Sequence, residues 1–457
     1  MVKSGTHRRK KWRGRLFILA FICLLSYVGY QAYPYASALL QGQPYLNPRA
    51  KTRSDETYQL EVWVKLPTLA DTKPAREMLE RSIAEFTAGR PNFEINITYL
   101  PEAQAMERLQ LALQAGTPPD LFFHADSSQT YYGELQIPLE IYLGPQEKLA
   151  WPQLVWQQAA IGKRVYALPV ALFPRVMLAN TELWQPTSCN QADVISAGWT
   201  WGQFLQCISE ADKGTVHGYV PTSIGDAFFA SMLASWGQPA ALTNDGSPAW
   251  TREHLISIAE AWTQLGQSGA VPSPPASMDS DCLNLFLNKK AAAIGPLNHH
   301  LATWLWKNAA EAGITPALWP MPSQTGHSDL RGVYLAAFRQ STYQGHRHTK
   351  ATAELAQYLV SELAKQMHQL TGAVPAQNHL LTDLNYPFSQ ESLAVYTDLA
   401  KALPVAYAYG PEPGIAARHW EHTIAPAWAT FVAGQYTADE FAEAILTGLV
   451  RATIAGP

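Results

Sequence analysis

Asp126 is the residue in this sequence whose type and position most directly suggest ligand binding. It follows Leu121-Phe122-Phe123-His124-Ala125, a run with the apolar character of a buried strand that leads into a polar loop. Open α/β sheets bind their ligands just beyond the carboxyl ends of strands. A carboxylate there accepts hydrogen bonds, for example from ligand hydroxyl groups. The alternative interpretation is that Asp126 is an ordinary helix N-cap.

No catalytic motif accompanies this carboxylate. The motifs G-x-x-x-x-G-K, G-x-S-x-G and H-E-x-x-H are absent, so the sequence shows no phosphate-binding loop, serine hydrolase elbow or zinc protease helix. No pair of carboxylates stands out for glycoside hydrolysis. Three pairs of nearby histidines lack the spacing of a known metal site and are interpreted as surface residues: His299/His300, His346/His348 and His419/His422. We therefore expect no enzyme, no metal and no cofactor.

The segment from Ala84 to Asp126 predicts the elements that position this carboxylate. Apolar residues at helical spacing end at Gly89, strict alternation follows from Phe93 to Tyr99, and a second helical stripe ends near Gly116. Strands that alternate with helices indicate a parallel sheet with helices on both faces.

Further elements follow along the chain. Extended apolar segments are predicted at 165–174, 291–296 and 332–338, and a helix is predicted at about 350–370. Capping boxes at Thr200 and Thr437 predict two more helix starts.

Composition limits the size, the partners and the chemistry. After the N-terminal leader, about 400 residues remain, which is too long for one ordinary hydrophobic core and long enough for two lobes. The net charge is −4, and no block of like charge follows the leader, so nucleic acid is a poor partner. The 15 tryptophans and 20 tyrosines either build a core or line a cleft in which rings pack against sugars.

The N-terminus predicts export across a membrane. Seven basic residues lie within 1–15, and the almost wholly apolar stretch Leu16 to Tyr30 follows. The positive-inside rule keeps the basic end in the cytosol and places the remainder outside. We favour an uncleaved signal anchor, and cleavage after Ala38 is the alternative. Lipidation of Cys23 is not expected, because it lies inside the apolar core behind Ile22. Residues 39–57 are expected to be a flexible linker.

Cys189 and Cys207 flank a short predicted loop and helix. In an oxidising compartment they either form a disulfide or stay as buried thiols, because spacing alone cannot establish geometry. Cys282 has no evident partner in the sequence.

Seven segments identify a family by their order. They are EFTAGRPNFEINITYL, LQLALQAGTPPDLFFHAD, ALPVALFPRVMLANTELW, GWTWGQFL, FLNKKAAAIGPLN, GVYLAAF and LTGAVPAQ. In this order they resemble the extracellular solute-binding proteins of bacterial ABC importers, specifically the sugar-binding group that includes maltose-binding protein. The resemblance runs from about Tyr58 to the C-terminus.

The resemblance implies a two-lobed periplasmic-binding-protein fold of type II. This is an α/β fold of two parallel-type sheets flanked by helices and joined by a hinge, here preceded by an N-terminal transmembrane helix. The expected domains are 1–38 as leader or anchor, 39–57 as linker, 58–171 with 332–385 as lobe 1, and 172–331 with 386–457 as lobe 2.

The resemblance also implies a function. We expect a monomeric receptor on the outer face of the cytoplasmic membrane that binds a mono- or oligosaccharide by hinge closure and delivers it to permease subunits. The alternatives are a tethered sensor for a signalling partner or, less in keeping with the sequence, an extracytoplasmic carbohydrate-active enzyme.

Six more residues join Asp126 in the expected ligand site. The resemblance places Trp63 on a strand that ends beside the cleft, although it can equally be plain core. Arg175 follows the first crossing between lobes and either binds ligand or makes an interlobe ion pair. Trp236 and Asn298 match loop positions that face sugar in similar proteins, and Gly332 and Tyr334 match the second crossing.

The chain departs from the family pattern at two positions. Ala179 and Leu297 stand where aromatic residues are usual, and Trp304 or Trp306 is a candidate to compensate. The sugar class stays plausible, and its identity stays open.

Overall fold

The structure is a computed structural model of the whole chain, and it describes most of the part that follows the leader. The described residues are 21, 26–29, 46–66, 73–127, 133–160, 164–185, 187–222, 224–238, 241–243, 247–272, 280–380, 385–398, 402–404 and 420–454. Within these ranges no helix is long and apolar enough to cross a membrane. Most of the predicted anchor, 16–30, lies outside the described residues.

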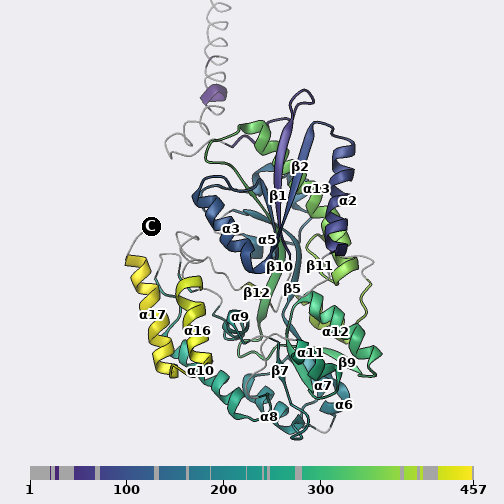
Figure 1. Ribbon diagram of the computed structural model, residues 1–457, viewed down its shortest axis with the longest axis vertical. Coiled ribbons are helices and arrows are strands. Elements are labelled where there is room, and N and C mark those ends of the chain that lie inside the picture. The colour runs from purple at the N-terminus through teal and green to yellow at the C-terminus, as the bar shows by residue number, and fades with distance from the viewer. Residues whose placement is uncertain are drawn as a thin grey trace, which may run out of the picture.

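Lobe 1 is built on an eight-stranded sheet, which occupies the upper half of Figure 1. Its main path runs in the order β11-β5-β10-β3-β1-β2, with β4 and β12 both paired to β10. The strands are β1 (Tyr58–Leu66), β2 (Phe93–Pro101), β3 (Leu121–Ser127), β4 (Gln136–Ile137), β5 (Ala167–Pro174), β10 (Ser328–Phe338), β11 (Val374–Pro375) and β12 (Ala402–Pro404).

Helices cover this sheet where the apolar stripes predict them. The long helix α13 packs against α2 and β5, while α3 packs against β1 and β2. Gly372, in the left-handed conformation that favours glycine, ends α13. The helices of this lobe are α2 (Lys73–Ala88), α3 (Glu102–Gln114), η1 (Leu139–Tyr142), α4 (Pro145–Lys148), α5 (Gln153–Ala159), α13 (His346–Thr371) and η2 (Asn378–Leu380).

Lobe 2 has a smaller sheet of four strands in the order β7-β8-β6-β9. Both of its faces are buried: Met177 and Ala179 face one apolar cluster, and Val176 and Leu178 face another, as the two-residue period of a strand requires. The strands are β6 (Val176–Asn180), β7 (Val220–Pro221), β8 (Ala293–Leu297) and β9 (Pro316–Pro320).

Many helices surround this second sheet. Both predicted capping boxes are confirmed, at Thr200 before α8 and at Thr437 before α17. The helices are α6 (Thr181–Trp184), α7 (Gln191–Ala197), α8 (Trp201–Ala211), α9 (Asp226–Ser235), α10 (Arg252–Gln267), α11 (Ser280–Leu287), α12 (His299–Glu311), α14 (Gln390–Thr397), the π-helical turn η4 (Trp420–Ile424), α16 (Ala425–Val432) and α17 (Ala438–Ile454). A disulfide joins Cys189 to Cys207 on α8.

The prediction of parallel-type sheets is wrong in part, because both sheets are mixed. Strand β1 is parallel to β2 and β3, but β10 runs antiparallel to β3 and β5. In lobe 2, β6 is antiparallel to both β8 and β9. The reason is the chain path: β10 enters lobe 1 from lobe 2, and so it runs opposite to the strands that leave.

The two crossings lie side by side. Strand β5 leaves lobe 1 at Pro174, Arg175 follows, and β6 starts lobe 2 at Val176, while β10 returns from Ser328. The strands of the first sheet therefore extend past the expected boundaries at 171 and 332. Strand β12, from the segment expected in lobe 2, pairs with β10 in the first sheet.

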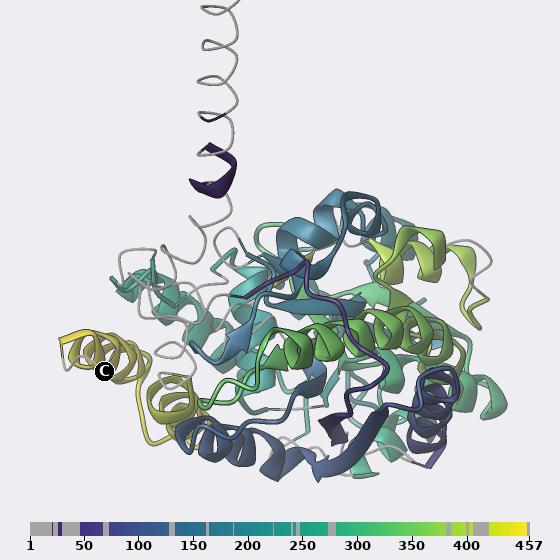
Figure 2. The same cartoon turned by 90° about the horizontal axis from the view of Figure 1, so that it is seen from above.

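The expected flexible linker differs from the structure over its second half. Residues 46–57 lie against lobe 1, where Leu46 packs on the apolar core and Thr52 donates a hydrogen bond to Glu354 on α13 (3.2 Å). Figure 2 shows this purple segment beside α13. Its polar composition predicted a free chain, but its partners lie far along the sequence.

Candidate functional site

Several of the predicted site residues lie at or beside the paired crossings. The backbone N–H of Arg175 donates to the carbonyl of Asp329 (2.8 Å), which fastens the first crossing to the second. Leu330, Arg331 and Gly332 of β10 pair with Pro174, Phe173 and Leu172 of β5. The Arg175 side chain is buried at this junction, with 7% of its surface exposed. These two strands therefore connect the two sheets directly and side by side.

A buried ion pair on β10 was missed by the sequence reasoning. Nε of Arg331 lies 2.6 Å from Oδ2 of Asp329, and the two side chains are 4% and 0% exposed. The available signal was two charged residues, spaced by two, in an otherwise apolar strand. Removing one partner of such a pair costs roughly 3–5 kcal/mol, because the other charge stays buried. The pair therefore fixes the local geometry of the second crossing.

Trp63 and Tyr334 lie on one face of the first sheet. Trp63 is opposite Phe122 in the ladder, and Tyr334 is opposite His124. Phe122 and His124 are two residues apart on β3 with ring centroids 5.3 Å apart, so all four side chains share a face. Trp63 is half-buried, while Tyr334 is buried in the lobe 1 core. His124 is a buried polar residue of this face that the sequence reasoning did not select.

Arg108 of α3 lies over the ring of Trp63. Its guanidinium carbon is 5.7 Å from the ring centroid, within the range of a cation–π contact. Trp63 therefore packs partly on the lobe 1 core, as one interpretation held, and is also contacted by the long side chain of Arg108.

Asp126 lies in β3, one residue before Ser127, which pairs with Gly332 of β10. Because residue 127 continues the strand, Asp126 is not the N-cap of a helix, and that alternative is wrong. The backbone of Asp126 thus lies at the carboxyl end of a buried strand, beside the second crossing.

Gly332 is required by packing. A Cβ at this position would lie 2.7 Å from Cδ2 of Leu172 and 2.7 Å from Cε2 of Tyr334, closer than such atoms approach in proteins. Glycine therefore permits the tight pairing of β10 with β5. Its effect on a ligand would be indirect, through the position of Tyr334.

In lobe 2, Trp236 follows helix α9 and is half-buried. Its ring centroid is 5.6 Å from that of Trp201, which anchors it to the aromatic core of this lobe. Asn298 is the N-cap of α12, where its Oδ1 accepts the N–H of Leu301 (2.9 Å). Asn298 therefore has a clear structural role in addition to its expected ligand contact.

The next residue, His299, connects the lobes. Its ring centroid is 4.2 Å from that of Phe173 on β5, and it is 6% exposed. The interpretation of His299 as a surface residue is wrong, because α12 begins directly against the first crossing. Burial lowers the pKa of the neighbouring His300.

Comparison with known proteins places this architecture in a family. The family model described as bacterial extracellular solute-binding protein matches residues 81–385. This chain belongs to that family. No curated protein matches the sequence of this solute-binding protein.

Solved structures of low sequence identity share its fold. The maltose/maltodextrin-binding domain MalE from Bdellovibrio bacteriovorus, bound to maltotriose, is 18% identical with a TM-score of 0.62, covering 86% of this chain and 99% of its own. A putative oligosaccharide periplasmic-binding protein from Synechococcus sp. MITs9220 is 16% identical with a TM-score of 0.66, covering 87% and 99%. The GacH receptor of Streptomyces glaucescens is 14% identical with a TM-score of 0.62, covering 88% and 100%. At these identities the comparison establishes the two-lobed fold.

The two departures from the family pattern are buried in the solute-binding protein. Ala179 and Leu297 are both fully buried in the lobe 2 sheet. Of the two tryptophans considered as compensation, Trp306 is buried with its ring 5.2 Å from that of Phe388, and Trp304 is 39% exposed. Trp306 is therefore core, and Trp304 has a free surface.

A groove of about 710 Å³ lies elsewhere on lobe 2. It runs between α10, α16 and α17, and none of the predicted site residues lines it. Arg252 spans it, with ion pairs to Asp439 (2.8 Å) and Glu443 (3.0 Å). Within the described residues no group of three or more metal-ligating side chains occurs.

Proposed function

We propose that this solute-binding protein is the receptor of an ABC importer and binds a mono- or oligosaccharide between its two lobes. Ligand would bridge the lobes and, through its higher affinity for the closed form, shift the population toward that form. The permease subunits would then recognise the closed receptor. No bond of the ligand is broken in this cycle.

The paired crossings carry the proposal. Strands β5 and β10 are adjacent and connect the two sheets, and the backbone N–H of Arg175, directly after β5, donates to the carbonyl of Asp329 on β10. Such a two-strand connection can bend while each lobe keeps its own core. The proposal is further supported by the family and by the fact that three neighbours of the same fold are described with maltotriose, maltotetraose or acarbose.

We propose distinct roles for the seven expected site residues. Asp126 would accept hydroxyl hydrogen bonds from lobe 1, and Trp236 would stack on a sugar ring from lobe 2. Trp63 and Arg175 would complete the lobe 1 and hinge sides of the cleft. Tyr334, Gly332 and Asn298 would act mainly by fixing the local backbone, as their packing and capping contacts suggest.

The compartment follows from the family and the leader. An extracellular solute-binding protein acts outside the cytoplasm. We propose that Leu16 to Tyr30 anchors it to the outer face of the membrane as a monomer, with cleavage after Ala38 as the alternative. We propose the expected lobes, 58–171 with 332–385 and 172–331 with 386–457, with the ends of β5 and β10 and the strand β12 added to lobe 1.

Calorimetry combined with small-angle scattering tests the proposal. Residues 39–457 titrated with maltotriose and a panel of other sugars should bind one ligand, and the radius of gyration should fall on binding. At one hundred times Kd, linkage adds about 2.7 kcal/mol to the free energy of unfolding. Consumption of the sugar without a stable complex would instead indicate an enzyme. A receptor that binds sugar but has no effect on uptake in transport-competent vesicles would indicate a sensor.

A further inference from the structure

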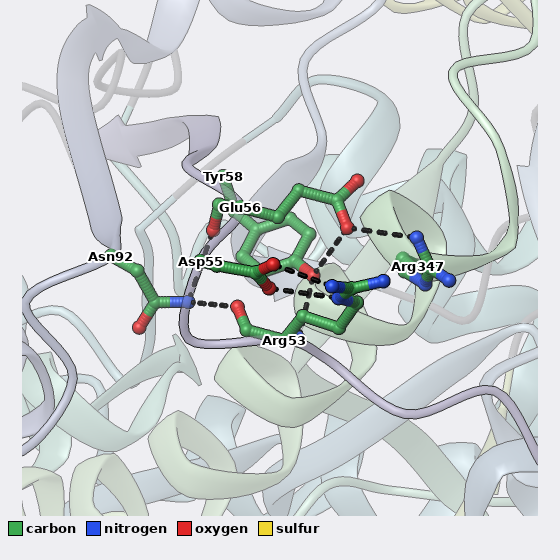
Figure 3. A network of polar contacts seen from close by, with 6 residues as sticks. All are labelled: Arg53, Asp55, Glu56, Tyr58, Asn92 and Arg347. Carbon is green, nitrogen blue, oxygen red and sulfur yellow. Dashed lines mark hydrogen bonds and ion pairs between the residues drawn. The ribbon is translucent and has the colours of Figure 1, made fainter.

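The segment 46–57 is held on lobe 1 by contacts from several distant parts of the chain (Figure 3). Nδ2 of Asn92, in the loop between α2 and β2, donates to the carbonyls of Arg53 (2.8 Å) and Glu56 (3.2 Å). The guanidinium of Arg347 on α13 lies 3.2 Å from the Glu56 carboxylate. Each of these partners belongs to lobe 1.

Arg53 is clamped through both of its backbone groups. Its N–H donates to Oη of Tyr58 (2.9 Å), and its carbonyl accepts from Asn92. The Tyr58 ring is buried in the lobe 1 core against Phe93, with centroids 5.3 Å apart. One of the two partners of Arg53 is therefore a core side chain. Release of the Arg53 backbone breaks the hydrogen bonds to Tyr58 and Asn92.

The start of α13 gives this segment an electrostatic reason to stay in place. The helix begins with His346, Arg347 and His348, has no acidic residue in its first turn and has Gly345 as an N-cap without a side-chain bond. Positive charge at a helix N-terminus is unfavourable, because that end carries the positive pole of the macrodipole. Glu56 pairs with Arg347, so residues 46–57 supply a carboxylate that the first turn of the helix lacks.

We propose that residues 46–57 are a strap that moves the attachment point of the N-terminal segment on lobe 1 from the start of β1 at Tyr58 to Leu46. Any pull from the N-terminal segment then acts on lobe 1 through the strap, and lobe 2 is left free to close. The consequence for closure rests on the proposed function, whereas the strap itself does not. Cleavage after Ala38 would leave the strap intact.

Limited trypsin digestion of the full-length chain in detergent tests the strap without any ligand. Cleavage after Arg53 needs local release of its backbone, so the rate reports the released population when opening is fast. We expect Asn92→Ala to accelerate this cut by roughly tenfold or more, because two hydrogen bonds to the strap are lost. Tyr58→Phe keeps the buried ring, removes the hydroxyl and should act in the same direction.

Two matched variants separate the strap from a general loss of stability. Asn96→Ala removes an exposed amide that bonds Glu61 (2.9 Å) one strand away, and Tyr99→Phe removes a hydroxyl that bonds Glu80 (3.1 Å). Neither contacts the strap, so both should be cut after Arg53 at the wild-type rate. Hydrogen exchange of the Arg53 amide, which donates to Tyr58, should be slow in these controls and faster in Asn92→Ala.

Equal cleavage after Arg53 in the wild type, Asn92→Ala and Tyr58→Phe would overturn the strap, as would an unprotected Arg53 amide in the wild type. Because no sugar is used, this result would leave the proposed receptor function untouched. Conversely, failure to bind sugar would not alter the digestion pattern.

Discussion

The two lobes use different means to build a core. Lobe 1 packs aliphatic residues, alanines, phenylalanines and tyrosines around its eight-stranded sheet, and Trp151 is its buried tryptophan among the described residues. Lobe 2 has a sheet of four strands and buries seven tryptophans in one cluster: Trp184, Trp199, Trp201, Trp250, Trp319, Trp420 and Trp428. A small sheet offers little surface for packing, and the large rings fill the space between the many helices.

The sequence left open whether the tryptophans build a core or line a cleft, and the structure places most of them in the core of lobe 2. The rings of lobe 2 meet at close distances, for example 4.8 Å between the centroids of Trp184 and Trp319 and 4.8 Å between those of Phe229 and Trp428. These rings are core. Trp63, Trp236 and Trp304 are exposed enough to meet a ligand, and so abundance of tryptophan is a poor guide to a sugar site.

Trp428→Ala should have the largest effect. Its side chain is fully buried, and its removal leaves a cavity among aromatic rings, so we expect the free energy of unfolding to fall by ~3–5 kcal/mol. Urea unfolding followed by circular dichroism measures the loss. Trp304→Ala, at an exposed site on the same lobe, is the control and should change stability by less than about 0.5 kcal/mol. Comparable losses in both variants would contradict an aromatic core in lobe 2.

Loss of the disulfide should also weaken lobe 2. The cysteines are separated by 18 residues, and closing a loop of about this length stabilises a fold by about 3 kcal/mol. The Cys189→Ser/Cys207→Ser variant should lose this amount in urea unfolding and become insensitive to reductant. Wild type that unfolds identically with and without reductant would contradict a stabilising role for the bridge.

Substitutions in the proposed ligand site should have a smaller energetic effect, on sugar affinity and not on stability, which distinguishes a cleft residue from a core residue. Trp236→Ala would lose a stacking surface worth about 1 kcal/mol beyond its area, and Asp126→Ala a hydrogen bond worth roughly 1.5–3 kcal/mol. Each should weaken sugar binding about tenfold or more, as measured by calorimetry. Melting curves without sugar supply the control, since a core role of Trp236 would lower stability and leave the affinity of the folded protein unchanged.

His300 should produce the smallest effect, a dependence of stability on pH. Burial lowers its pKa in the folded state below the ordinary value of 6.5, so the unfolded chain binds the proton more readily. Stability should therefore fall as the pH drops from 7 to 5, and part of this fall should disappear in His300→Gln. The control is His422→Gln, at an exposed position. An identical pH profile in wild type and His300→Gln would exclude this contribution.

Local patterns predicted the elements well and their long-range pairing poorly. The alternation from Phe93 to Tyr99 became β2, and the capping box at Thr200 opened α8, because both depend on neighbours in sequence. The direction of β10 depends on where the chain returns from lobe 2, which no local pattern records.

The candidate site shows the same division. The sequence placed Asp126 at a strand end and Arg175 at a crossing, and both positions hold. The burial of His299 against Phe173 required knowledge of which surfaces meet. The Asp329–Arg331 pair and the capping role of Asn298 join neighbours in sequence, and the sequence reasoning overlooked them. The sequence therefore located candidates along the chain better than it assigned their contacts.

With the proposed anchor retained, the strap would also set how far the proposed receptor can stand from the membrane. If an anchor that ends at Tyr30 is retained, residues 31–45 span at most about 50 Å, whereas 31–57 without a strap would span at most about 95 Å. The volume within reach would shrink with the cube of that length, by about sevenfold, and the local concentration of receptor at a neighbouring permease would rise accordingly. Holding the twelve residues 46–57 on lobe 1 would thus shorten the free tether.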